Sequence, residues 1–293
     1  MKSSGTFFFI FLVAYQLIFY YTLARLRPWL GGAFAQSPWF LIVLQIIALL
    51  LPLFIWLAIK KERLRDHIPN NRLGFRNVVY ILVISFLMLP VMSLISALST
   101  FLAPNAAADA LGQLQPHSLW LLLLAMAVTP AVAEELVFRG YIQSQYPGWA
   151  FWKVALLNGF LFGFIHLNIQ QFFYAFAMGV VMAYFVYHTR SIRAGILSHF
   201  FVNAFNIALF RFAAWLVPEM ERLLYEAGDA EALTAIQATE VSEWAAVIFV
   251  GVIAVVFLPF AVILFRMFIR YNKTIEREAR ILDMHIVKEG DVS

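Results

Sequence analysis

The segment 118–140 reads SLWLLLLAMAVTPAVAEELVFRG, and it decides the fold class. No residue from Ser118 to Ala133 is charged, and Glu134, Glu135 and Arg139 follow directly. A nearly uncharged run of this kind approaches the roughly 20 apolar residues that cross a hydrocarbon core. The segment is therefore typical of a transmembrane helix that carries charged side chains near one end.

The rest of the chain has the same apolar character. Of its 293 residues, 63% are hydrophobic and 13% are charged, and the mean hydropathy is +0.81. A soluble domain carries about 25% charged residues, so this composition excludes a soluble globular protein. The chain has no cysteine, which excludes disulfides, thiolate nucleophiles and cysteine-ligated metal sites.

Hydropathy predicts an all-α polytopic membrane protein with about eight transmembrane helices. The predicted spans are 6–23, 39–59, 78–102, 118–138, 154–167, 172–187, 192–212 and 244–268. The fifth is shorter than a membrane crossing requires. We therefore expect this span to begin inside the membrane or to be strongly tilted.

The distribution of Lys and Arg predicts the orientation of the bundle. Basic residues gather in 60–76 and 266–288, whereas the segment 213–243 is acidic. Because cytoplasmic loops retain positive charge, both termini are expected in the cytoplasm. The net charge of +4 then reflects membrane topology, and we expect the lipid bilayer, not nucleic acid, as a partner.

The sequence predicts one membrane domain in four parts, with no repeat and no separate soluble domain. These parts are the first three helices (1–117), a core of helices four to seven (118–212), an acidic outer loop with the last span (213–271), and a cytosolic tail (272–293). Within the loop, 219–234 mixes acidic and apolar residues, which favours an amphipathic helix. The tail is expected to form a short helix that frays.

Charged residues inside the fourth span are functional candidates, because ionisable groups are costly in a membrane. Glu135 and Arg139 lie four residues apart and share one helix face in the favourable order. Glu134 is rotated by about 100° from Glu135 around the helix axis. We therefore expect Glu135 to pair with Arg139, while Glu134 faces a cavity.

Two histidines and an asparagine on later spans extend this polar set. His166 ends the fifth span, and His199 and Asn203 share one face of the seventh. Each histidine alone is explained equally well by an interhelical hydrogen bond. Together with Glu134 they form the parts of an amide hydrolase, because a carboxylate and an imidazole can deprotonate water. An amide and an imidazolium can stabilise an oxyanion.

A metal site is a second interpretation of the same residues. One glutamate and two histidines with an open position are a known ligand set for catalytic zinc. The sequence lacks the HExxH spacing that places two ligands on one helix turn. Zinc bound by Glu134, His166 and His199 and a metal-free mechanism therefore both stay open.

Three motifs resemble those of the CAAX protease and bacteriocin-processing (CPBP) family of intramembrane peptidases, which includes the Ras-converting CAAX endoprotease. That family has EExxxR, then FxxxH, then HxxxN or HxxxD on separate membrane helices. This chain has all three in the same order, and the resemblance covers about 131–206. The matching positions are Glu134, Glu135 and Arg139, then Phe162 and His166, then His199 and Asn203.

The resemblance implies a role for each matching residue. Glu134 would activate water with His166 as its partner, His199 and Asn203 would stabilise the oxyanion, and Glu135 with Arg139 would support the site structurally. The substrate would be a membrane-associated peptide or a lipidated, CAAX-like protein. Members of the family are classed as metalloproteases and also as metal-free glutamate peptidases, so the resemblance leaves the zinc question open.

We therefore expect an intramembrane endopeptidase in a bacterial-type plasma membrane, with an active site that opens to the cytoplasmic half. One alternative is a non-catalytic scaffold or immunity protein of the same fold, although such a binder does not need all four catalytic candidates. Another is an ion-coupled transporter, in which buried Glu and His would relay charge. The chain lacks the repeats that are common in transporters, which disfavours that alternative. No pattern in the sequence indicates an oligomeric state.

Overall fold

The computed structural model describes the backbone of residues 4–26, 29, 34, 36–114, 116–228 and 243–290, and the side chains of these except 106–107, 243, 246 and 278–290. The described residues form helices and no β-strand. Among the described residues, seven helical stretches are long and apolar enough to cross a membrane, so the chain is an all-α polytopic membrane protein. These stretches are Ser4–Leu26, Pro38–Lys60, Phe75–Thr100, Leu119–Ile142, Ile169–Thr189, Ile192–Ala227 and Val247–Arg277.

The fifth predicted span is the exception. It corresponds to helix α9 (Phe151–Phe164), which has 14 residues. At 1.5 Å per residue this helix is about 21 Å long, less than the roughly 30 Å of a hydrocarbon core. Among the described residues, the structure thus has seven full-length candidate spans and one short apolar helix, which lies at the span that was predicted to be short.

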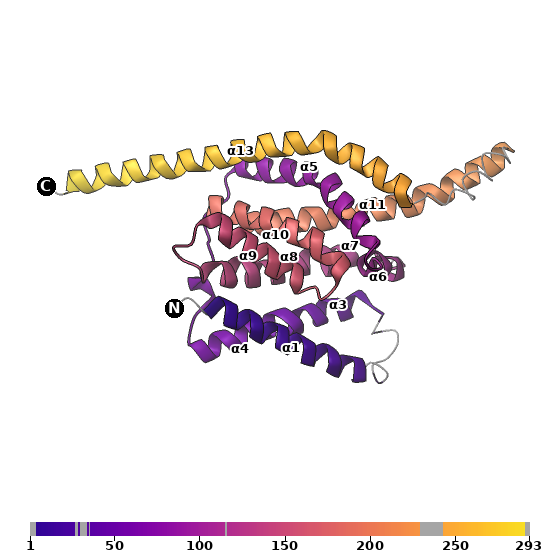
Figure 1. The fold of residues 1–293 in the computed structure, drawn as a ribbon, viewed down its shortest axis with the longest axis horizontal. Helices are drawn as coiled ribbons and strands as arrows, with labels where there is room; N and C mark the ends of the chain where they lie inside the picture. Colours follow the sequence, from indigo (N-terminus) through magenta and orange to yellow (C-terminus); the bar gives the residue numbers. More distant parts are fainter. Residues whose placement is uncertain are drawn as a thin grey trace.

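The helices form three layers in Figure 1. On one side α1 (Ser4–Leu26) packs against α4 (Leu51–Lys60), and on the other side α13 (Glu243–Gly290) runs along α5 (Phe75–Thr100). The middle layer holds α8, α9, α10 and the first part of α11, and it carries every candidate site residue. Helix α8 spans Thr129–Glu135, α10 spans Ile169–Thr189 and α11 spans Ile192–Ala227.

In two of the described spans a proline occurs together with π-helical turns, and side chains from other helices bond to backbone carbonyls there. The second span consists of α3 (Pro38–Gln45), the π-helical turn η2 (Ile46–Leu50) and α4. The fourth span begins with α7 (Leu119–Leu123) and the π-helical turn η4 (Leu124–Val128). It continues with α8 and ends with the π-helical turn η5 (Leu136–Ile142). A proline has no N–H, so the carbonyl four residues earlier loses its helical partner. The Ala48 carbonyl, four residues before Pro52, accepts a hydrogen bond from Gln16 Nε2 on α1 at 3.4 Å.

Small residues let α9 and α10 cross closely. A Cβ added to Gly159 would lie 2.7 Å from the Phe176 carbonyl oxygen, and one added to Gly179 would lie 2.7 Å from the Gly159 Cα. Larger side chains at these positions would force the helices apart. Helices α9 and α10 therefore approach closely, which brings the α10 backbone near the fourth span.

Two helices are longer than their predicted spans. Helix α11 continues to Ala227 and ends at Gly228, whose φ of 69° is the left-handed conformation that glycine adopts easily. The predicted amphipathic helix 219–234 is thus the end of α11 up to residue 227, and residues 229–242 lie outside the described residues. Helix α13 runs on to Gly290, so most of the predicted tail continues the last span. A further short helix, α6 (Ala106–Leu114), was not predicted.

The two ends of the bundle differ in their connections. At one end the loop 61–74 meets the α10–α11 turn, where Ile192 N donates to the Pro69 carbonyl at 2.7 Å. We call this the basic end, because it carries Lys60, Lys61, Arg63, Arg65, Arg72, Arg76, Lys153, Arg190 and Arg193. The other end holds α6 and the α9–α10 connection, and we call it the α6 end. There the Phe101 ring stacks on Trp244 with centroids 4.8 Å apart.

Candidate active site

Glu135 and Arg139 form a buried ion pair in the fourth span. Arg139 Nη1 donates to Glu135 Oε1 at 2.7 Å, and both side chains have no exposed surface. Arg139 Nη2 also donates to the Gly179 carbonyl on α10 at 3.1 Å, and its guanidinium carbon lies 4.4 Å from the centre of the Phe162 ring. Buried charges require such partners, and the predicted pairing of Glu135 with Arg139 is present.

Gly195 on α11 makes room for the Glu135 carboxylate. A Cβ at this position would meet Glu135 Oε2 at 2.2 Å and Glu135 Cδ at 3.1 Å. Any other residue would have to displace the carboxylate or the helix. Sequence reasoning did not identify Gly195, because a single glycine within an apolar helix carries no pattern of its own.

His199 lies beside both carboxylates of the fourth span. Its Nδ1 is 3.2 Å from Glu135 Oε1, and its Nε2 is 3.8 Å from Glu134 Oε2. Because a carboxylate only accepts, Nδ1 is the donor to Glu135. The other ring nitrogen, Nε2, therefore faces Glu134. Glu134 keeps 14% of its side chain exposed, whereas Glu135 keeps none.

The Phe162 ring contacts both histidines. Its ring centre is 5.2 Å from that of His166 and 5.8 Å from that of His199, and both contacts are edge-to-face. His166 Nδ1 donates to the Phe162 carbonyl at 2.8 Å. The short helix α9 thus brings His166 to the same cavity as His199, although their positions along the two helices differ.

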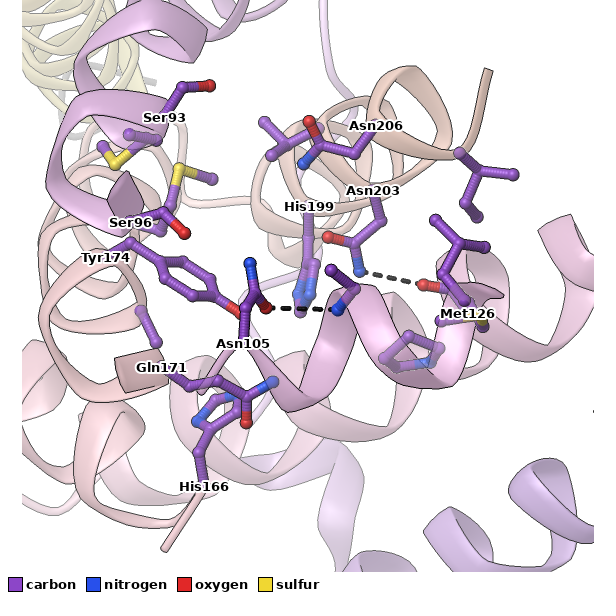
Figure 2. A pocket seen from close by; sticks show the side chains of 18 of the residues that line it. Ser93, Ser96, Asn105, Met126, His166, Gln171, Tyr174, His199, Asn203 and Asn206 are labelled. Carbon is purple, nitrogen blue, oxygen red and sulfur yellow. Dashed lines mark hydrogen bonds between the residues drawn. The ribbon is translucent and has the colours of Figure 1, made fainter. Parts of the chain in front are cut away.

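A cavity of about 790 Å³ connects these residues (Figure 2). Apolar side chains form much of its wall, and polar side chains from α5, α10 and α11 point into it. The cavity is large enough for several residues of a peptide. Its polar lining consists of Gln45, Ser93, Ser96, Thr100, Asn105, Glu134, His166, Gln171, Tyr174, His199, Asn203 and Asn206.

Asn203 has a structural contact that the sequence did not predict. Pro130 leaves the carbonyl of Met126 without its helical partner, and Asn203 Nδ2 donates to this oxygen at 3.0 Å (Figure 2). The amide nitrogen carries two hydrogens, so one remains for another acceptor. Asn203 therefore joins α11 to the fourth span while it also lines the cavity.

Asn158 is a second polar residue whose role becomes clear only in the structure. It is 1% exposed and donates from Nδ2 to the Phe138 carbonyl at 2.7 Å. That carbonyl belongs to the π-helical turn η5, where the hydrogen bonding of a regular helix is disturbed. Asn158 thus fixes the turn that carries Arg139.

The donors do not form a preassembled metal site. Among the described residues, no group of three or more His, Asp or Glu side chains lies close enough together to hold a metal ion. The Phe162 ring contacts both His166 and His199, and His166 Nδ1 is already bonded to a carbonyl. In this arrangement the residues do not fit a bound zinc, so no step below is routed through a metal.

A comparison with known proteins finds one family match. Residues 116–205 match the family model described as type II CAAX prenyl endopeptidase, Rce1-like. Neither a curated protein nor a solved structure matches the chain. The matched segment begins just before α7 and ends in α11 beyond Asn203, so it contains every candidate site residue. This segment is therefore similar to the Rce1-like CAAX prenyl endopeptidases.

Proposed function

We propose that this protein is an intramembrane endopeptidase that uses Glu134 to activate water. The observation that carries the proposal is the contrast between two adjacent carboxylates. Glu135 is fully buried and paired with Arg139, whereas Glu134 lines the cavity beside His199. A carboxylate that is not held by a cation and faces a cavity is suited to accept a proton from water.

Hydrolysis needs a proton acceptor and donors to the oxyanion. In the proposed reaction, Glu134 and His166 hold the water molecule. Its oxygen bonds to the carbonyl carbon of the substrate while one proton moves to Glu134. The carbon–nitrogen bond then breaks, and Glu134 returns this proton to the departing amine. The products are a carboxylic acid and an amine, and the acid then passes its proton to the amine. The result is a carboxylate and an ammonium group, so atoms and charges balance.

Two groups on α11 are placed to stabilise the developing negative charge. His199 Nε2 is the ring nitrogen on the side of Glu134, and it donates when it carries a proton. Asn203 retains one amide hydrogen beyond its bond to Met126. Preorganised donors of this kind contribute about 2.7–4 kcal/mol each in known hydrolases.

The proposed substrate is a membrane-associated peptide or a lipidated, CAAX-like protein. The matched family is described as prenyl endopeptidases, and the cavity wall is rich in apolar side chains such as Leu89, Met178 and Met182. Such a wall favours an apolar chain or apolar side chains. We place the protein in the plasma membrane of a bacterial-type cell, in line with its short loops.

The test is cleavage by the purified protein in detergent. A library of quenched fluorescent peptides, with and without prenylated ends, is incubated with the wild type, Glu134→Gln and Glu219→Gln. Glu219 is the matched control, because its carboxylate pairs with Arg222 on the surface, away from the cavity. The proposal predicts cleavage by the wild type and the control, and loss of cleavage in Glu134→Gln.

Chelation provides a second arm of the same experiment. Because the donors do not gather into a metal site, cleavage is expected to persist after treatment with a strong chelator. Loss of cleavage that zinc restores would show that a metal takes part. Absence of cleavage by a folded wild type across the library would contradict the proposal and favour a non-catalytic scaffold.

A further inference from the structure

The chain turns sharply directly after His166. Helix α9 ends at Phe164 and α10 begins at Ile169, so four residues connect two helices that pack against each other. The two helices lie close together, because a Cβ added to Gly163 would meet the Phe172 carbonyl oxygen at 2.7 Å. The connection therefore has to reverse the direction of the chain over a short distance, as in a tight helical hairpin.

Leu167 adopts a left-handed backbone conformation within this connection, with a φ of 50°. Glycine and asparagine adopt this conformation easily, whereas it is uncommon for a bulky residue. The Leu167 side chain is 42% exposed, so its burial gives little reason for a leucine at this position. The other described non-glycine residues with a positive φ are Lys61 and Arg190, and both lie at the basic end. Such conformations persist where the surrounding structure fixes them, and they are frequent at active sites.

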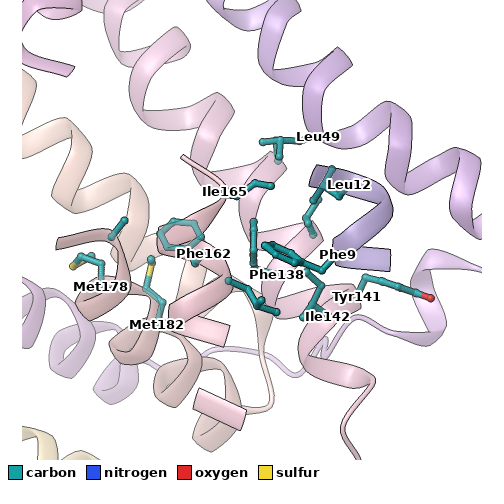
Figure 3. Close-up of a cluster of buried hydrophobic side chains, with 14 of the residues drawn as sticks. Phe9, Leu12, Leu49, Phe138, Tyr141, Ile142, Phe162, Ile165, Met178 and Met182 are labelled. Atoms are coloured by element: carbon teal, nitrogen blue, oxygen red, sulfur yellow. The ribbon is translucent and has the colours of Figure 1, made fainter. Parts of the chain in front are cut away.

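Both sides of the turn are anchored. Ile165, the first connecting residue, is 7% exposed and lies in the buried apolar cluster that also contains Phe162 (Figure 3). Asn168, the last connecting residue, caps the N-terminus of α10. Its Oδ1 accepts hydrogen bonds at 2.8 and 3.2 Å from the backbone N–H groups of Gln170 and Gln171. The two residues between these anchors therefore have little freedom to move.

The turn also sets the orientation of the His166 ring. In a regular α-helix the Phe162 carbonyl would accept from the His166 N–H, but this N–H donates to the Gly163 carbonyl at 3.3 Å. The His166 ring takes its place, because Nδ1 donates to the Phe162 carbonyl at 2.8 Å. Nε2 is then the ring nitrogen that remains for the cavity, which His166 lines. In the neutral ring this nitrogen carries a lone pair and can accept a hydrogen bond from water.

We infer that Leu167 and Asn168 are positioning residues for His166. The left-handed conformation of Leu167 lets the chain turn directly after His166, and the Asn168 cap fixes the far side of the turn. Together they place the imidazole that holds the water in the proposed reaction. It is the backbone conformation of Leu167 that matters, and not its exposed side chain. This inference rests on the proposed function for the role of His166.

Two substitutions of Leu167 separate its backbone conformation from its side chain. Glycine adopts the left-handed conformation at no steric cost, so Leu167→Gly should keep kcat for peptide cleavage near the wild-type value. Isoleucine is as large as leucine, but its branched Cβ makes this conformation a strong outlier. Leu167→Ile should lower kcat by about a hundredfold, the loss expected when a reacting group shifts by about 1 Å, and should leave KM nearly unchanged. A folded Leu167→Ile with the wild-type kcat, or a Leu167→Gly that is equally slow, would overturn the inference.

Lys61→Ile is the matched control. Lys61 ends α4 with a φ of 57° and is exposed at the basic end, whereas the turn after His166 lies at the α6 end. An isoleucine at position 61 therefore meets the same backbone conflict at the opposite end of the bundle. Lys61→Ile should lower the unfolding midpoint, as Leu167→Ile does, but keep the wild-type kcat. An equal loss of kcat in both variants would reflect general destabilisation and contradict the inference.

Asn168 tests the same turn from its other side, and it keeps the test decisive if Leu167→Ile does not fold. Asn168→Ala removes the cap of α10, whereas Asn168→Asp keeps an acceptor oxygen at the helix N-terminus. Asn168→Ala should lower kcat, and Asn168→Asp should restore it. A wild-type kcat in folded Asn168→Ala would show that the turn does not position His166.

Nitrogen NMR of isotope-labelled histidine rings separates this inference from the proposed function. The chain has six histidines, and His166→Gln identifies the signal of His166 by its loss. The wild type and Leu167→Gly should show a His166 ring that is protonated at Nδ1 and bonded there, and Leu167→Ile and Asn168→Ala should lose this signature. If both variants keep it, the inference is wrong whether or not any peptide is cleaved. If they lose it while cleavage is unchanged, the turn positions His166, but the proposed role of His166 in holding the water fails.

Discussion

The half of the bundle next to the basic end is packed around Glu135, whereas the half next to the α6 end encloses a cavity at Glu134. These two regions meet within a single turn of the fourth span. Glu135 bonds to Arg139 and His199 without exposed surface, and Glu134 keeps part of its carboxylate open to the cavity. Adjacent residues on a helix point about 100° apart around its axis. One helix can therefore bury one carboxylate in an ion pair and leave its neighbour open to a cavity.

Contacts in the packed region hold His199 in its position at the cavity. His199 is fixed by Glu135, which is fixed by Arg139, which in turn is bonded to the Gly179 carbonyl on α10. This chain of contacts links the fourth span to α10 and α11. Changes in the packed half are thus expected to act mainly on stability, and changes in the cavity half mainly on cleavage.

The largest effect on stability is expected for Arg139→Ala. Removing the guanidinium leaves the Glu135 carboxylate buried without its cation, which costs about 3–5 kcal/mol of unfolding free energy. The matched control is Arg222→Ala, because Arg222 also pairs with glutamates but is exposed. An exposed pair contributes only about 0–1 kcal/mol. Unfolding of both variants in detergent micelles, followed by circular dichroism, compares them, and equal losses would contradict the contrast between the regions.

A smaller effect is expected for Gly195→Ala. The added methyl group would collide with Glu135 Oε2, and overpacking of this kind costs about 1–3 kcal/mol. Gly112→Ala in α6 is the control, because nothing lies within 4 Å of its added Cβ. We expect the control to keep or raise the unfolding midpoint. A wild-type midpoint in Gly195→Ala would show that the carboxylate is not confined there.

An effect of similar size is expected at the contact that joins the two regions. Asn203→Ala leaves the Met126 carbonyl unpaired and is expected to cost about 1–3 kcal/mol. Pro130→Ala restores the missing N–H, so the same change should cost less in that background. A double-mutant cycle on the unfolding free energy measures this difference. Equal costs in both backgrounds would mean that Asn203 does not compensate for the proline.

Cleavage by the same variants separates the two roles of Asn203. If Asn203 also donates to the oxyanion, Pro130→Ala cannot rescue the activity of Asn203→Ala, even where it rescues stability. Full recovery of cleavage in the double variant would restrict Asn203 to a structural role.

Much of this architecture could be predicted from the sequence, because span positions follow from hydropathy alone. The i, i+4 relation of Glu135 and Arg139 likewise fixes their pairing before any tertiary contact is known. The family motifs identified the region that the Rce1-like model matches. These features depend on local spacing, which a single sequence contains.

The remaining features depend on contacts between distant segments. The bond of Asn203 to Met126 arises from a proline on another helix, and the fit of Gly195 to Glu135 arises from helix packing. Helix α6 borders the cavity, but its short alanine-rich sequence gives no span signal. The entrance expected at the cytoplasmic half was inferred from motif positions and stays a prediction.

The most direct test of the division between the two carboxylates compares Glu134→Gln with Glu135→Gln in the same preparation. Glu134→Gln should lower kcat for peptide cleavage by at least about a hundredfold, as expected for a lost general base, and should leave the unfolding midpoint unchanged. Glu135→Gln should lower the midpoint, because Arg139 is then buried without its anion. Cleavage at the wild-type rate by Glu134→Gln, or a midpoint that falls in Glu134→Gln and not in Glu135→Gln, would contradict the account.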